Sequence, residues 1–147
     1  MALSKDWREF LEFLNSRRVD YVIVGAQSLA FHGRPHHTGD LDVLIRPAPD
    51  NARRLLALLN DFGFEQSGFK ETDFLHPEQI IQFGQVPTRI DLLTSISGVS
   101  TKEAFASKIT ATLDGIPVFI LGRDVLIRNK RAVGWPQDLA DLAALRA

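Results

Sequence analysis

The sequence predicts a single α/β (α+β) domain, residues 1–147, in which helices flank a mixed β-sheet. A chain of 147 residues suits one domain with a real hydrophobic core. Helix and strand patterns alternate in the first half of the chain, whereas antiparallel hairpin patterns follow later, and this combination is typical of a mixed sheet. No internal repeat, low-complexity tract or linker indicates a second domain.

The first half of the chain begins with an amphipathic helix. Trp7, Leu11 and Leu14 recur at helical spacing. Ser4 precedes them, so we expect it to cap a helix that ends near Ser16. The short β-branched stretches that follow predict buried strands interrupted by glycine and proline. The elements expected next are a strand at Tyr21–Val24, a helix at Ala26–His32, a strand at Leu41–Ile45 and a helix from about Asn51 to Phe62.

The second half is predicted to contain two hairpins and three helices. Asp114-Gly115 favours the turn that joins twisted antiparallel strands. Pro117 indicates that its strand lies at a sheet edge, because proline has no N–H for the ladder. Thr101 is the expected cap of a short helix. In order, the elements are strands at Gln79–Phe83 and Arg89–Thr94, a helix at Thr101–Lys108, strands at Ile109–Leu113 and Ile116–Leu121, and helices at Arg123–Arg131 and Pro136–Arg146.

Composition and charge exclude several classes of protein. Hydrophobic residues make up 45% of the chain and charged residues 24%, as in ordinary globular proteins and unlike disordered or fibrous ones. A net charge of -1 excludes the uniformly basic surface of a dedicated nucleic-acid binder. The absence of cysteine excludes disulfides and thiolate metal sites. The N-terminal stretch lacks a signal-peptide hydrophobic region and no apolar run reaches membrane-spanning length, so we expect a cytoplasmic protein without a membrane partner.

Three carboxylates are the strongest candidates for chemistry. Asp40 and Asp42 flank Leu41 at the start of a strand, and the strand period of two puts both acids on one face. Asp91 lies within an otherwise mostly apolar strand. If the two strands are neighbours, the three carboxylates converge and can hold two Mg²⁺ ions roughly 3.5–4 Å apart for an in-line phosphoryl displacement. All three are therefore candidate metal ligands and catalytic residues, and Asp91 is expected to help activate an acceptor hydroxyl.

Two other interpretations of these patterns remain open. An Asp-x-Asp pair is common on exposed strand ends, and Asp91 can instead be neutralised by Arg89 or by a backbone cap. His32, His36 and His37 form an alternative metal site with hydrolytic chemistry, because imidazole suits zinc and iron. In the first interpretation the three carboxylates bind no metal. In the second, a different metal binds at the histidines.

Two stretches of the chain resemble the nucleotidyltransferase superfamily, which has a polymerase-β-like fold. In Val22–Pro35 a strand leads through a glycine into a helix, and Thr38–Ile45 carries the acidic pair. The likeness is greatest to small bacterial proteins related to AbiEii-type toxins and to minimal nucleotidyltransferases. The stretch Asn129–Asp141 is similar to the closing segment of that group. In the superfamily a third acidic residue lies on a later strand, and the residues here that match its motif are Gly25, Asp40, Asp42 and Asp91.

The resemblance implies a nucleoside triphosphate (NTP) as substrate and Mg²⁺, with two ions expected, as cofactor. The chain departs from the family pattern at Ala26, where a second glycine or serine is usual, and at Trp135, where an arginine is expected. Backbone N–H groups at a helix start and basic side chains attract phosphate. The nucleotide-binding candidates are accordingly Gly25, Ala26, Ser28, Arg34 and Lys130.

Two functions follow from the resemblance. The first is metal-dependent transfer of a nucleoside monophosphate from an NTP to a hydroxyl of RNA or of a protein. The second is favoured by the departures from the family pattern: a catalytically weak or inactive nucleotidyltransferase-like domain that binds a nucleotide or a partner protein, as in a toxin–antitoxin pair. The expected partners are therefore an NTP, an RNA or protein acceptor, and an antitoxin or toxin.

Overall fold

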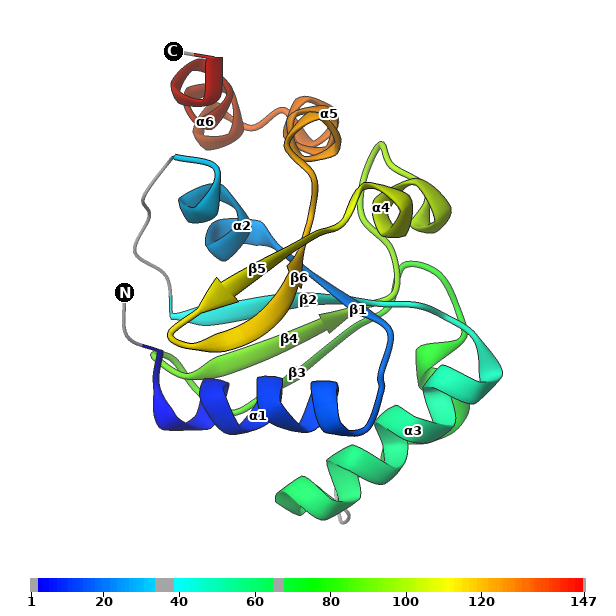
Figure 1. Cartoon of the computed structure of the whole chain (residues 1–147). Coiled ribbons are helices and arrows are strands. Elements are labelled where there is room, and N and C mark those ends of the chain that lie inside the picture. The colour runs from blue at the N-terminus through cyan, green and yellow to red at the C-terminus, as the bar shows by residue number, and fades with distance from the viewer. Residues whose placement is uncertain (1–2, 34–38, 65–67, 147) are drawn as a thin grey trace.

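The protein folds into a six-stranded mixed β-sheet with helices on both faces (Figure 1). The computed structural model describes residues 3–33, 39–64 and 68–146. Within these ranges no helix combines the length and the apolar character needed to cross a membrane. In chain order the elements are α1 (Lys5–Ser16), β1 (Tyr21–Val24), α2 (Gly25–Phe31), β2 (Asp40–Ile45), α3 (Pro49–Leu59), η1 (Asn60–Phe64), η3 (Glu71–Phe74), β3 (Ile80–Phe83), β4 (Arg89–Leu93), α4 (Thr101–Ser107), β5 (Ile109–Leu113), β6 (Ile116–Ile120), α5 (Arg123–Val133) and α6 (Pro136–Arg146).

The strand order β3-β4-β2-β1-β6-β5 confirms the predicted mixed sheet. β1 runs antiparallel to β2 and parallel to β6, while β2 runs parallel to β4. The two predicted hairpins, β3–β4 and β5–β6, form the two ends of the sheet. β2 therefore lies between β1 and β4, which places Asp40 and Asp42 next to the strand that carries Asp91.

Alternating side chains divide the core into two clusters, one on each face of the sheet. On β1, Tyr21 and Ile23 belong to the cluster that includes the apolar residues of α1 and α3. Val22 and Val24 belong to the other cluster, with residues of α2, α4 and α5. Because helices cover both faces, all four residues of β1 are buried.

Serine hydroxyls cap two helices, and one of these caps differs from the prediction. Ser4 accepts a 3.2 Å hydrogen bond from the backbone N–H of Trp7 at the start of α1, as expected. At α4 the predicted cap Thr101 is wrong, because Ser100 is the cap. The Ser100 hydroxyl accepts from the N–H of Glu103 at 3.1 Å, and the Glu103 carboxylate accepts from the N–H of Ser100 at 3.2 Å. This reciprocal pair satisfies two N–H groups at once.

The prediction that Pro117 marks an edge strand is wrong, because β6 lies between β1 and β5. The pairing of β1 with β6 joins Ile23 to Ile120, so it ends before it reaches Pro117. There the side-chain amide of Asn15 on α1 donates a 2.7 Å hydrogen bond to the carbonyl of Pro117. An interior strand accepts this proline because no neighbouring strand needs its missing N–H.

A mostly buried charge cluster joins α5 to α6. Lys130 Nζ lies 3.2 Å from Asp138 Oδ1 and 3.6 Å from Asp141 Oδ2. These side chains are 16%, 11% and 1% exposed, in that order. Asp138 also accepts a 3.1 Å hydrogen bond from the N–H of Trp135 at the start of α6. One ammonium group therefore serves two carboxylates that have little access to water.

Ser100→Ala should lower the free energy of unfolding by about 1 kcal/mol, because it removes the acceptor for the Glu103 N–H. Thr101→Ala is the matched control and should leave the free energy nearly unchanged. Urea denaturation of both variants measures the difference. Equal losses in the two variants would contradict the capping assignment.

Lys130→Gln should lower the free energy of unfolding by about 3 kcal/mol, because it removes the ammonium group that two desolvated carboxylates share. The control is Arg53→Gln, which breaks an ion pair with Asp50. The side chains of Arg53 and Asp50 are 59% and 78% exposed. That exposed pair should contribute less than about 1 kcal/mol. Urea denaturation measures the free energy of unfolding of both variants. A decrease in Lys130→Gln no larger than in the control would contradict the stabilising role of the cluster.

Candidate active site

The three predicted acidic residues project from the same face of the sheet. On β2 the apolar residues at odd-numbered positions pack in the cluster with α1 and α3, so Asp40 and Asp42 point to the opposite face. On β4, Ile90 and Leu92 pack in that same cluster, so Asp91 points with the two acids of β2. Strand alternation alone decides this orientation.

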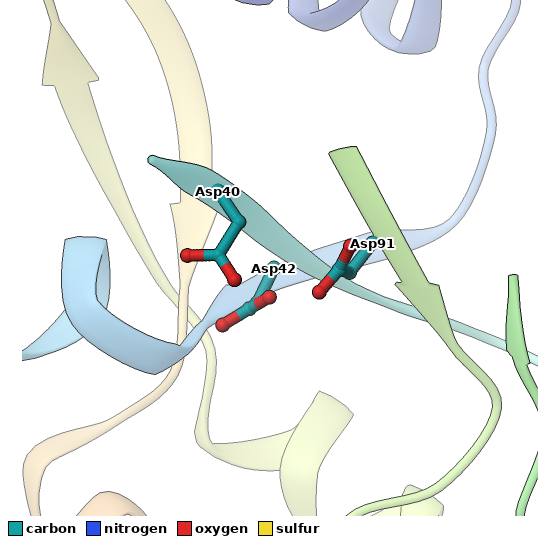
Figure 2. A group of neighbouring side chains, drawn as sticks. All are labelled: Asp40, Asp42 and Asp91. Carbon is teal, nitrogen blue, oxygen red and sulfur yellow. The ribbon is translucent and has the colours of Figure 1, made fainter. Parts of the chain in front are cut away.

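The parallel pairing of β2 with β4 brings the three carboxylates together. Asp42 is opposite Asp91, and Asp40 is opposite Arg89. One oxygen of each carboxylate lies within 4.8 Å of the others. Figure 2 shows the three side chains extending from the two strands into a common space. The structure therefore unites the residues that the sequence singled out as metal ligands.

One arginine contacts two of these carboxylates. Arg89 Nε donates to Asp91 Oδ1 at 3.0 Å, and Nη2 donates to Asp91 Oδ2 at 3.2 Å. The same Nη2 donates to Asp40 Oδ2 at 2.7 Å. Arg89 thus pairs with Asp91, as the alternative interpretation of Asp91 expected, and it also contacts Asp40. The single charge of Arg89 cannot by itself balance three ionised carboxylates.

The pKa of Asp42 is raised from its ordinary value of 3.8 to about 7. Desolvation by burial is the largest cause, followed by the charges of Asp40 and Asp91, while Arg89 acts in the opposite direction. A cation bound among these groups would favour the charged form of Asp42. A divalent cation at this place would therefore lower the pKa of Asp42.

Gly25 lets the start of α2 approach the carboxylates. Its φ is +67°, a conformation that favours glycine. A Cβ at this position would lie 2.2 Å from Asp42 Oδ2. Any other residue would displace either the turn or the carboxylate. The glycine expected from the family motif thus has a local steric reason.

A cavity of about 500 Å³ opens beside Asp42 and Asp91, bounded by Gly25, by β3 and β4, and by α5. This volume is within the usual range for small-molecule sites. Gln82 on β3 is opposite Asp91, and its amide lies 3.4 Å from Asp91 Oδ2. Asn129 on α5 lines another side of the same cavity. The Gln82 amide therefore lies beside Asp91, whereas the Asn129 amide donates a 2.9 Å hydrogen bond to the Ser97 carbonyl in the cavity wall.

Gln82 and Asn129 were not among the candidates predicted from the sequence. The position of Gln82 depends on the register of the β3–β4 hairpin, and that of Asn129 on the packing of α5. No residue spacing along the chain signals either one. Arg89, by contrast, lies two residues before Asp91, and the strand period alone puts both on one face.

Two predicted nucleotide-binding residues lie in surroundings of different kinds. Ser28 on α2 is fully buried, and its hydroxyl has no hydrogen-bond partner among the described residues. Lys130 directs its ammonium group to Asp138 and Asp141 of α6. An unpartnered buried hydroxyl is costly and calls for an explanation, whereas the ammonium of Lys130 already has two partners.

The remaining predicted site residues are Ala26, Arg34 and the three histidines. Ala26 follows Gly25 in the first turn of α2. Arg34, His36 and His37 lie outside the described residues, so the predicted histidine metal site is not placed. His32, the remaining member of that site, has Nε2 2.8 Å from the backbone carbonyl of Leu121.

Searches against protein-family models and against curated protein sequences find no match for this chain. Solved structures with related folds do match. TM1012 of Thermotoga maritima, assigned as a nucleotidyltransferase, aligns with a TM-score of 0.63 at 14% identity over 93% of this chain and 88% of its own. An antigenic nucleotidyltransferase-like protein of Paracoccidioides brasiliensis aligns with a TM-score of 0.58 at 14% identity, covering 93% and 72%.

A third similar structure is ANT(2'')-Ia in complex with adenylyl-2''-tobramycin. It aligns with a TM-score of 0.58 at 13% identity, over 95% of this chain and 84% of its own. At such identities the likeness concerns the fold, so membership of the AbiEii-type group stays a prediction. The mixed sheet, its helices and these alignments show that the chain has a nucleotidyltransferase fold.

Proposed function

We propose that this protein is a metal-dependent nucleotidyltransferase that moves a nucleoside monophosphate from an NTP to a hydroxyl of RNA or of a protein. The observation that carries the proposal is the group of three carboxylates, within 4.8 Å of one another, beside a cavity in a nucleotidyltransferase fold. A cytoplasmic location, expected from the sequence, belongs to the same proposal, as does pairing with an antitoxin or toxin, which the AbiEii resemblance implies.

The residues at the site fit hard divalent cations. Asp40 and Asp42 on β2 and Asp91 on β4 are the proposed ligands, and carboxylate oxygen is the donor that Mg²⁺ prefers. The raised pKa of Asp42 supports this assignment, because a bound cation would favour its charged form. Gly25 supports it too, because the lack of a side chain leaves room beside Asp42. When bound, Mg²⁺ would offset the charge of the triphosphate and make the acceptor hydroxyl more acidic.

Asp91 is the proposed base for the acceptor hydroxyl. The acceptor oxygen forms a bond to the α-phosphorus as the bond from that phosphorus to the β-phosphate oxygen breaks, so pyrophosphate leaves with the electron pair. The hydroxyl proton passes to Asp91 and then to solvent. The Asp91 side chain is 9% exposed, and hydrogen bonds from Arg89 and Gln82 hold its orientation. A fixed carboxylate suits positioned proton transfer.

The start of α2 is the proposed triphosphate site. Gly25 and Ala26 contribute backbone N–H groups beside Asp42, and Val24 gives the helix no side-chain cap. Uncapped N–H groups at a helix start attract phosphate. The unpartnered hydroxyl of Ser28 lies on the same helix and is a further proposed donor.

Arg34 and Lys130 are proposed as additional contacts to the triphosphate. Lys130 can contribute only if its ammonium group is shared with Asp138 and Asp141, which already hold it. The acceptor is proposed on the side of Asp91. In ANT(2'')-Ia the complex contains an adenylylated aminoglycoside, so the test of acceptors should include such a compound beside RNA and protein.

The direct test is transfer of label from α-phosphate-labelled NTPs, with Mg²⁺, to total RNA, to a protein mixture or to an aminoglycoside. Wild-type protein should transfer label to one acceptor and release pyrophosphate. Asp42→Asn and Asp91→Asn should each lower the rate roughly 100-fold or more, because each removes a charged group at the reacting phosphate. Asp50→Asn, at an exposed position on α3, is the control and should keep the wild-type rate. Nucleotide binding without transfer to any acceptor would favour the binding-module alternative.

Metal-free protein should lose stability as pH rises from about 4 to about 7. The pKa of Asp42 is about 7 in the folded protein against an ordinary 3.8, so the folded state binds the proton more tightly than the unfolded state does. The contribution of Asp42 is therefore complete below pH 4, falls by up to about 1.4 kcal/mol per pH unit, and levels off above pH 7.

Mg²⁺ should reverse this loss, because it competes with the proton for Asp42. The stabilisation by Mg²⁺ should be larger at pH 8 than at pH 6. Urea denaturation in EDTA and in Mg²⁺ from about pH 4 to about pH 8 measures both effects. Asp42→Asn should abolish the Asp42 part of the pH slope while other titrating groups remain. An unchanged slope in that variant would contradict the assignment.

A further inference from the structure

We propose that Arg89 is the resident cation of the carboxylate cluster: it holds Asp40 and Asp91 in place without metal and competes with divalent metal for them. This inference rests on the proposed function, and it adds a residue whose charge sets the metal affinity of the site. Arg89 is therefore a positioning residue, because it acts on the ligands of the metal.

The guanidinium group of Arg89 lies between two of the proposed ligands. Nη2 is 2.7 Å from Asp40 Oδ2 on β2 and 3.2 Å from Asp91 Oδ2 on β4. Nε is 3.0 Å from Asp91 Oδ1. Both oxygens of Asp91 and one oxygen of Asp40 thus accept hydrogen bonds from a single cation. A metal that bridges these two carboxylates must share their oxygens with Arg89 or displace it.

The sheet fixes Arg89 at this place. The register pairs Arg89 with Asp40 across the two strands, and the strand period puts it on the same face as Asp91. The indole Nε1 of Trp7 donates a 3.2 Å hydrogen bond to the backbone carbonyl of Arg89. The side chain itself is 31% exposed. The backbone is therefore anchored, whereas the guanidinium has room to withdraw toward solvent.

Arg89 cannot leave the cluster by losing its proton, because guanidinium stays charged at all physiological pH values. The positive charge of Arg89 can therefore leave the carboxylates only if the side chain moves away from them. Asp42 receives no hydrogen bond from Arg89 among the described contacts. The first metal ion is accordingly expected beside Asp42, and a second ion is expected to meet competition from Arg89.

The test is to titrate the protein with Mn²⁺ alone, without nucleotide. Isothermal titration calorimetry measures the affinity, and thermal unfolding measures the stability at each Mn²⁺ concentration. Arg89→Gln should bind Mn²⁺ roughly tenfold more tightly, because it removes a cation at contact distance from two ligands. Its metal-free form should unfold at a lower temperature than wild type. The gap should close as Mn²⁺ is added, since the metal then neutralises the same carboxylates.

Two further variants make the result specific. Arg8→Gln removes one arginine from the ion pair with Asp114 on the opposite side of the sheet, and it should bind Mn²⁺ as wild type does. Arg89→Lys keeps the charge but loses the planar fork that makes three contacts. It should bind Mn²⁺ with an affinity between wild type and Arg89→Gln, and it supplies the comparison if Arg89→Gln does not fold without metal.

The outcomes separate the two proposals. Wild-type protein that binds no Mn²⁺ would contradict the proposed metal-dependent function itself. Wild-type protein that binds Mn²⁺, together with Arg89 variants that bind it no more tightly, would contradict only the competition between Arg89 and the metal. Tighter binding in the Arg89 variants and unchanged binding in Arg8→Gln would support the inference.

Discussion

Electrostatic repulsion among Asp40, Asp42 and Asp91 is the constraint on which the site depends. The parallel register of β2 and β4 puts Asp42 opposite Asp91, and partial burial limits the help that water gives. The pKa of Asp42 is raised to about 7, mostly by desolvation through burial and further by the charges of Asp40 and Asp91. Arg89 offsets part of this repulsion through Asp40 and Asp91. The remaining negative charge is what a divalent cation would neutralise.

The fold surrounds this charge with groups of complementary character. β2 lies between β1 and β4, so Asp40 and Asp42 have β1 on one side and the β3–β4 hairpin, which carries Asp91, on the other. Gly25 permits α2 to begin against Asp42. Gln82 reaches Asp91 from β3. In the proposed function, the start of α2 would attract the phosphates and the carboxylates would hold the metal.

Most elements were predictable because their signals are local. The spacing of Trp7, Leu11 and Leu14 gives α1, and Asp114-Gly115 gives the β5–β6 hairpin. Thr101 was predicted as the cap of α4, but Ser100 beside it forms the capping box. β6 was predicted at an edge because the sequence does not reveal that its pairing with β1 ends before Pro117. The shared face of the acids follows from strand period. Their closeness, and the contacts of Arg89 and Lys130, depend on pairing between segments far apart in sequence.

The central claim is that the three carboxylates form a cation site that works with a bound triphosphate. It is tested most directly by a crystal structure with Mn²⁺ and a non-hydrolysable NTP analogue, using the anomalous signal of manganese. Anomalous density is expected about 2.1 Å from the oxygens of Asp42 and Asp91, with the triphosphate at the start of α2. A triphosphate bound elsewhere, or carboxylates without manganese at saturating Mn²⁺, would contradict it.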